Sequence, residues 1–119
     1  MRKILVVDDE HDTLDAVSIL LKKRGFEVKT STNWHTVFDC VIAYKPDLIL
    51  LDITLKGADG RDICRQLKKS RYTHNIPVIL FSGNHNITGK LNECAANAFI
   101  QKPFESSLLM NTINTHLIG

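Results

Sequence analysis

Three acidic side chains stand where two short apolar runs of this sequence end. Asp8 and Asp9 follow the first run and Asp52 follows a later one, while two further runs lead to a hydroxyl at Ser82 and an ammonium at Lys102. Carboxylates that share one site resist ionising together unless a positive charge relieves their repulsion. Mg²⁺ takes six oxygen ligands and commonly combines one or two carboxylates with waters and a phosphate. These residue types therefore predict a magnesium site that handles a phosphoryl group.

Within such a site Asp52 is the best candidate nucleophile, because an aspartate can attack a phosphoryl group and become an aspartyl phosphate. The ammonium of Lys102 can pair with one phosphoryl oxygen, and the hydroxyl of Ser82 can donate to another. Gly83 lets the backbone approach closely. The metal would neutralise the charge on the transferring oxygens.

Each of these residues alone also has a purely structural explanation. Asp8 or Asp9 can cap a following helix, Asp52 and Ser82 can begin turns, and Lys102 can be a solvated surface lysine. Two capping acids together with Asp52 exceed what a helix end needs. The joint position of these residues after apolar runs is what favours a functional site.

Five short apolar runs, rich in β-branched residues, predict the strands that position these groups, at 4–7, 28–30, 48–51, 78–81 and 99–100. Segments whose apolar residues have helical spacing predict helices over 14–21, 34–42, 63–67, 91–95 and 108–117. Strands and helices that alternate in this way predict an α/β fold with a parallel sheet covered by helices on both faces. The carboxyl ends of parallel strands lie at one edge, where such sheets bind ligands.

Length and composition bound the remaining possibilities. The 119 residues suit one domain spanning 1–119, and no apolar stretch approaches the roughly 20 residues of a membrane span. The apolar run Ile4–Val7 is shorter than the signal-peptide core of about 7–15 residues, so we expect a cytoplasmic protein. A formal net charge of +2 does not indicate nucleic-acid binding. Cys40, Cys64 and Cys94 are expected to be free thiols, since their spacing suggests neither disulfides nor zinc.

The order of these residues resembles that of the response-regulator receiver domains of two-component signalling. The resemblance rests on the pair Asp8-Asp9, on Asp52, on Ser82 and on the triplet Lys102-Pro103-Phe104, and it extends over essentially the whole chain. It implies a single flavodoxin-like (βα)5 domain whose five parallel strands have the order 2-1-3-4-5. It also implies a cis peptide bond before the proline of that triplet.

The resemblance further implies how the site works. Mg²⁺ would be held by Asp9, Asp52 and the backbone carbonyl of Thr54, with Asp8 assisting. The phosphoryl group would come to Asp52 from a histidine kinase or a histidine phosphotransfer protein. Such a domain catalyses only its own phosphorylation and dephosphorylation and is not an enzyme with a separate substrate.

A switch toward downstream partners is also implied. The phosphate would draw the hydroxyl of Ser82 inward, and the aromatic ring of Phe99 would follow it. This movement would reshape the face formed by the fourth helix, the fifth strand and the fifth helix. The partner that binds this face would be an effector protein or an output domain outside this chain. We expect no membrane contact and no direct nucleic-acid binding by this domain.

Several positions depart from the family pattern. Lys56 stands where a proline is common, and the segment 82–102 is shorter than usual and contains Gly89, which disfavours a helix. Thr54 and Asn84, two positions after Asp52 and Ser82 respectively, carry no carboxylate. We therefore expect dephosphorylation that is not assisted by a strong base at these positions.

Three other classes of protein compete with this interpretation. A flavin carrier needs a hydroxyl- and glycine-rich phosphate loop after the first strand, where this chain has acids. A hydrolase with an aspartyl nucleophile needs a D-x-D pair and a cap domain, for which the chain has no room. A degenerate receiver, acting as a phosphorylation-independent protein-interaction module, would lack part of the five-residue site that is present here. That module is the alternative function.

Overall fold

A computed structural model describes residues 1–83 and 94–117 of the chain. Its main sheet has five strands in the order β2-β1-β3-β6-β7, and every neighbouring pair is parallel. Counted along the chain, this is the predicted order 2-1-3-4-5. The strands are β1 (Lys3–Val7), β2 (Glu27–Ser31), β3 (Leu48–Asp52), β6 (Val78–Ser82) and β7 (Ala98–Gln101).

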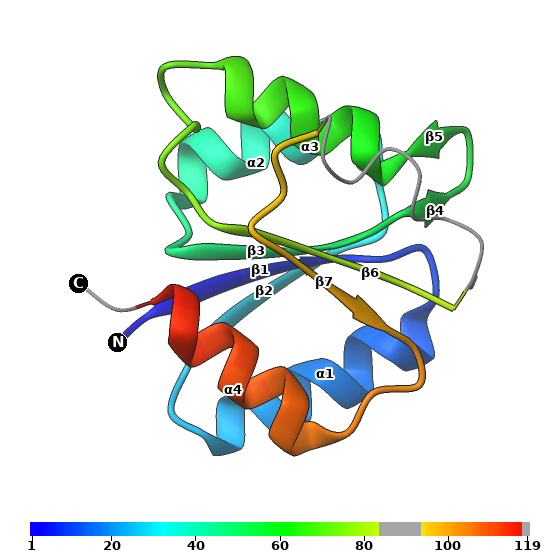
Figure 1. The fold of residues 1–119 in the computed structure, drawn as a ribbon, viewed down its shortest axis with the longest axis vertical. Helices are drawn as coiled ribbons and strands as arrows, with labels where there is room; N and C mark the ends of the chain where they lie inside the picture. Colours follow the sequence, from blue (N-terminus) through cyan, green and yellow to red (C-terminus); the bar gives the residue numbers. More distant parts are fainter. Residues whose placement is uncertain (84–93, 118–119) are drawn as a thin grey trace.

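Helices cover both faces of this sheet, as predicted (Figure 1). The helices α2 (Val37–Tyr44) and α3 (Gly60–Lys69) lie on one face, and α1 (His11–Lys23) and α4 (Ser106–His116) lie on the other. Alternate residues of β1, β3 and β6 point to opposite faces and enter two separate apolar clusters, one under each pair of helices. The two clusters explain why these strands are continuous apolar runs rather than alternating ones.

Three segments differ from the sequence prediction. The predicted helix over 34–42 begins as a 3-10 turn, η1 (Trp34–Thr36), and only then continues as α2. The predicted helix over 91–95 lies mostly outside the described residues, and its last two positions form a turn in which Ala95 has φ +60°. The segment after β3, for which the sequence indicated no strand, forms an antiparallel hairpin that joins β4 (Thr54–Leu55) to β5 (Ala58–Asp59).

The hairpin brings the chain back against the end of β3. The amide of Gly60 donates to the carbonyl oxygen of Ile53 at 2.8 Å. A side chain at Gly60 would overlap the backbone oxygen of Asp52, so only glycine permits this approach. The backbone around Asp52 is thereby fixed from both sides. None of the helices in the described part of the chain has the length and apolar character needed to span a bilayer.

Candidate functional site

Strand alternation directs three charged side chains to the α1/α4 side of the sheet. Asp8 directly follows β1, Asp52 is the last residue of β3, and Lys102 directly follows β7. The residues two positions earlier on each strand all belong to the apolar cluster under α1 and α4. Because side chains in a strand alternate with a period of two, the three charged groups continue that same face beyond its apolar part.

Lys102 crosses the neighbouring strand to reach the two carboxylates. Its ammonium lies 4.7 Å from the ring centroid of Phe81, which occupies the intervening strand β6. Lys102 Nζ is 2.8 Å from Asp8 Oδ2 and 3.6 Å from Asp52 Oδ2. The apolar part of the Lys102 side chain thus extends over the ring of Phe81, and its ammonium reaches the middle of the sheet from the edge strand β7.

Backbone amides hold the other oxygens of the two carboxylates. Asp8 Oδ1 accepts from the amide of Glu10 at 3.0 Å, and Asp52 Oδ1 accepts from the amide of Thr54 at 3.2 Å. Asp8 is completely buried and Asp52 is only 3% exposed. Both acidic groups are therefore fixed in position rather than free to turn into solvent.

The surroundings of Asp52 raise the pKa of its carboxyl and so shift it toward its neutral form. Burial is the largest cause that raises the pKa of Asp52, and the negative charge of Asp8 raises it further. The positive charge of Lys102 and the amide of Thr54 lower it but do not compensate, so the pKa of Asp52 is raised to about 7. One ammonium does not neutralise this group of acids.

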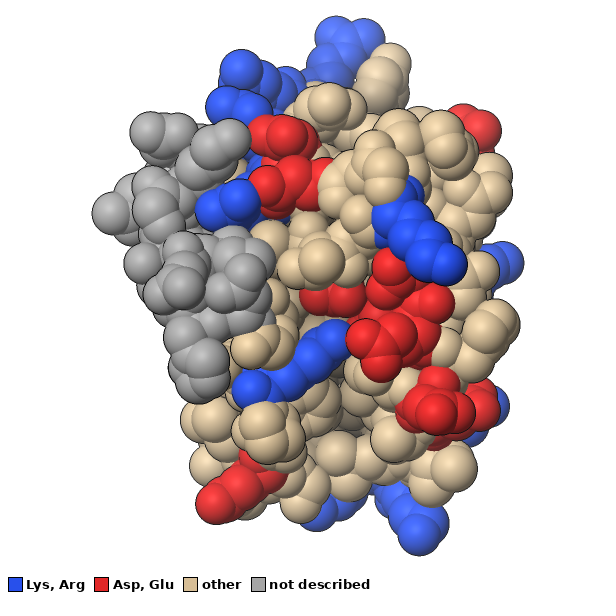
Figure 2. Space-filling view, turned by 90° about the vertical axis from the view of Figure 1, so that its right-hand side faces the viewer, with Lys and Arg blue, Asp and Glu red and all other residues tan. Residues whose placement is uncertain are grey.

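A cavity of about 610 Å³ opens above these groups at the carboxyl edge of the sheet. Figure 2 shows acidic side chains gathered in the middle of this face, with basic side chains bordering them. Asp8 lies beneath the cavity, whose lining residues are Asp9, Glu10, Asp52, Thr54, Lys56, Ser82, Gly83 and Lys102.

The donor atoms of this cavity fit a hard divalent cation. One oxygen from each of Asp8, Asp9 and Glu10 lies within 4.8 Å of the others, and the carboxylate of Asp52 faces the same cavity. Carboxylate oxygens are the ligands that Mg²⁺ prefers, and the burial of Asp52 beside the negative charge of Asp8 favours additional positive charge there. The residues present therefore fit the metal predicted from the sequence.

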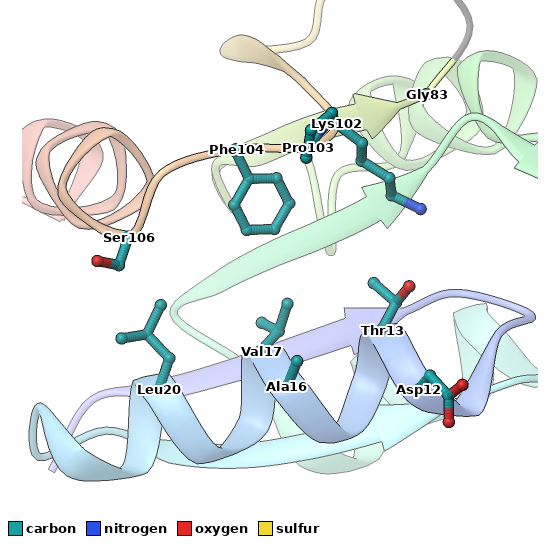
Figure 3. A pocket seen from close by; sticks show the side chains of 10 residues that line it. All are labelled: Asp12, Thr13, Ala16, Val17, Leu20, Gly83, Lys102, Pro103, Phe104 and Ser106. Atoms are coloured by element: carbon teal, nitrogen blue, oxygen red, sulfur yellow. The ribbon is translucent and has the colours of Figure 1, made fainter.

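A second, apolar cavity of about 700 Å³ lies beside the first and shares Gly83 and Lys102 with it. Figure 3 shows Val17 and Leu20 of α1 and the ring of Phe104 pointing into this space from opposite sides. It is a groove between α1 and the segment that leads from β7 to α4. The acidic cavity and the apolar groove thus form one continuous surface.

The structure brings together most of the predicted site. Asp8, Asp9, Asp52, Ser82 and Lys102 meet at one edge of the sheet, and Thr54 lines the same cavity. The peptide bond before Pro103 is cis, as the resemblance implied.

Phe99 lies apart from the cavity. It is half-buried and packs against the apolar cluster under α2 and α3. The predicted positions Asn84 and Gly89 lie outside the described residues.

Sequence reasoning did not identify two lining residues. Glu10 follows the acidic pair directly, but no apolar run marked it as a strand end. Lys56 was noted only as a departure from the usual proline, because the hairpin that turns it toward the cavity was not predicted. The one feature of the sequence that could have indicated a place for Lys56 at the site is its position only four residues after Asp52.

Comparison with known proteins agrees with this geometry. The family model for the response regulator receiver domain matches residues 4–114. The chain belongs to this family. It is a receiver domain of two-component signalling, and receiver domains are signalling modules rather than conventional enzymes.

Solved receiver domains superpose closely on this one. The signal receiver domain of a signal transduction histidine kinase from Syntrophus aciditrophicus is 27% identical with a TM-score of 0.92, and the match covers 98% of this chain and 90% of that one. The BeF3-activated N-terminal receiver domain of Klebsiella pneumoniae RstA is 26% identical with a TM-score of 0.89, over 99% and 100% of the two chains. NtrX from Brucella abortus is 33% identical with a TM-score of 0.87, over 98% of this chain but only 27% of NtrX.

Replacement of Asp52 by asparagine should stabilise the metal-free receiver at alkaline pH. The folded pKa of about 7 lies above that of an unfolded aspartate, about 3.9. The contribution of this carboxyl to the free energy of unfolding is therefore fully present below the unfolded pKa. That contribution is lost as the pH rises through about 7. In EDTA at about pH 8 we expect the Tm of Asp52→Asn to exceed that of the wild type by roughly 5 °C.

The two proteins should converge as the pH falls toward about 4. Asp39→Asn is the matched control, because Asp39 is an exposed residue of α2. Thermal melts across the pH range make the comparison, and a difference that is absent at alkaline pH or grows on acidification contradicts this electrostatic assignment.

Proposed function

We propose that this receiver is a phosphorylation-activated switch that accepts a phosphoryl group on Asp52 in a Mg²⁺-dependent reaction. The observation that carries the proposal is the ammonium of Lys102, which lies 2.8 Å from Asp8 and 3.6 Å from Asp52 at the floor of an open acidic cavity. A purely structural ion pair would need neither the cavity nor the additional carboxylates around it.

The arrangement suits in-line transfer from a phosphohistidine. An oxygen of Asp52 forms a bond to phosphorus while the bond from phosphorus to the donor imidazole nitrogen breaks, and the freed imidazole takes a proton from solvent. The hydrogen bond from the Thr54 amide keeps the carboxylate of Asp52 oriented during the attack. Asp9, Asp52 and the carbonyl of Thr54, with Asp8, would hold Mg²⁺, which when bound neutralises charge on the transferring oxygens.

Lys102 and Ser82 would retain the added group. The ammonium of Lys102 lies 3.6 Å from Asp52 Oδ2, close enough to pair with a phosphoryl oxygen on that residue, and Ser82 lines the same cavity. A hydrogen bond from the Lys102 amide to the Ser82 carbonyl, 2.8 Å long, couples the ends of β6 and β7. Charge-assisted contacts of this kind favour the phosphorylated arrangement of both strand ends.

Ser82 and Phe99 would pass the change on to a partner. Their strands pair in parallel, and alternation places both side chains on the α2/α3 face of the sheet. An effector protein or an output domain outside this chain would bind the reshaped surface. In NtrX the matched region is about a quarter of a longer chain, which supports the second possibility.

The phosphate donor would be a histidine kinase or a histidine phosphotransfer protein acting in the cytoplasm. The apolar groove between α1 and Phe104 (Figure 3) shares lining residues with the acidic cavity, so a helix seated in the groove could present a phosphohistidine to Asp52. Because the groove is apolar and the cavity is charged, docking and chemistry would use separate contacts.

Acetyl phosphate with Mg²⁺ provides a direct test of the acceptor. Intact-protein mass spectrometry should show a gain of one phosphoryl group in the wild type and none in Asp52→Asn, because the amide cannot form the acyl phosphate. EDTA should prevent the gain. A wild type that takes no phosphate would favour the phosphorylation-independent interaction module instead.

A second variant separates docking from chemistry. Ala16 is an exposed residue of α1 that lines the apolar groove, so Ala16→Glu should place a charge there without disturbing the core. Transfer from autophosphorylated histidine kinases should fall by about tenfold or more, the loss expected when an apolar anchor site must bury a charge. Modification by acetyl phosphate should remain unchanged.

Ala43→Glu is the matched control, since Ala43 is an exposed residue of α2 on the other face. Equal transfer rates for Ala16→Glu and wild type would show that the donor protein does not use this groove.

A further inference from the structure

The β4–β5 hairpin places a second lysine at the phosphoacceptor cavity. Leu55 pairs with Ala58, and the two residues between them, Lys56 and Gly57, form the turn. Gly57 has φ +80°, a left-handed conformation that favours glycine. Proline is favoured at the position before such a glycine in a type II turn. This chain has lysine there, so the turn carries a charge.

The backbone of the turn that carries this lysine is held at both ends. The indole nitrogen of Trp34 lies 3.5 Å from the point that a Cβ atom on Gly57 would occupy, so the indole packs directly against the turn. On the other end of the hairpin, Gly60 packs against the backbone of Asp52. The hairpin is therefore clamped between η1 and the end of β3.

The two lysines of the cavity differ in how their charge is used. Lys102 is engaged with Asp8 and Asp52 and is largely buried. Lys56 is exposed and lines the same cavity, and within the described residues its ammonium has neither an ion pair nor a hydrogen bond. Lys56 is therefore a positive charge at an acidic cavity, and its ammonium is paired with no other residue in the described part of the chain.

We propose that Lys56 is a second ammonium of the phosphoryl-binding site. It contacts the phosphoryl oxygens on Asp52 from the hairpin side, on the wall of the cavity formed by β4, while Lys102 reaches them from β7. The contact restricts the approach of water and so lengthens the lifetime of the aspartyl phosphate. In the unmodified receiver the same charge repels Mg²⁺ and weakens its binding. This inference rests on the proposed function of Asp52.

The charge of Lys56 should affect the lifetime of the phosphorylated form and the affinity for Mg²⁺ in opposite directions, whereas a purely structural role would affect both in the same direction. A positive charge attracts the dianionic phosphoryl group and repels the metal, so its removal must shorten the lifetime of the phosphorylated form and tighten Mg²⁺ binding. Across a solvated cavity one charge changes each constant by about threefold, because water and salt screen the interaction. Damage to the hairpin would instead weaken both functions together.

The test compares Lys56→Gln, Lys56→Arg and a matched control, Lys69→Gln, which removes an exposed charge at the far end of α3. Mg²⁺ affinity is measured by NMR titration of the unphosphorylated proteins. Phosphate release is measured at saturating Mg²⁺ after acetyl phosphate is removed. For Lys56→Gln we expect a Mg²⁺ dissociation constant about threefold lower and a half-life about threefold shorter. Lys56→Arg and the control should match the wild type.

Unchanged values for Lys56→Gln, or changes of both constants in the weakening direction, overturn the role of Lys56. A failure of the proposed function has a different signature, because then the wild type takes no phosphate or Asp52→Asn takes as much as the wild type. Phosphorylation confined to the wild-type Asp52, with an unaltered decay in Lys56→Gln, refutes only the lysine.

Discussion

At the carboxyl edge of the sheet, the buried carboxylates carry more negative charge than the nearby ammonium offsets, and the properties of the site follow from this excess. Asp8 is completely buried and Asp52 almost so, and among the described residues a single ammonium, that of Lys102, lies between them. Burial of like charges is unfavourable unless opposite charge compensates for it, and here the compensation is incomplete, as the raised pKa of Asp52 indicates. A site with this imbalance favours a divalent cation. In the proposed function, a cation bound there would favour the ionised form of this carboxylate, which is the form that can act as a nucleophile.

The fold generates this imbalance by simple geometric means. Parallel strands end at one edge, and the two-residue alternation of side chains sends Asp8, Asp52 and Lys102 to the same face. Because β6 separates β7 from β3, the lysine must pass over a neighbour, and the ring of Phe81 provides an apolar surface for it. The hairpin after β3 then closes one wall of the cavity and adds Lys56 to it.

Most of the sheet and of the site could be predicted from the sequence, because both depend on local patterns. Continuous β-branched runs marked the buried strands, and the polar residues that ended them marked the site. The β4–β5 hairpin could not be predicted in this way, since strands of two residues are too short to show a period. Lys56 was missed because it owes its place in the cavity to this hairpin, and Glu10 was missed because no apolar run marks it as a strand end. The acceptor role of Asp52, the metal-ligand roles around it and the switch roles of Ser82 and Phe99 remain predictions. The proposed metal ligands are Asp8, Asp9, Asp52 and Thr54.

Titration of the wild type with Mg²⁺, followed by thermal unfolding, tests the central electrostatic claim most directly. A cation that binds only the folded state raises Tm as its concentration increases. We predict a rise for the wild type and for Asp39→Asn, and a much flatter response for Asp9→Asn and Asp52→Asn, which each remove one negative charge from the cavity. A wild-type Tm that does not respond to Mg²⁺, or equal responses in all four proteins, would contradict the account.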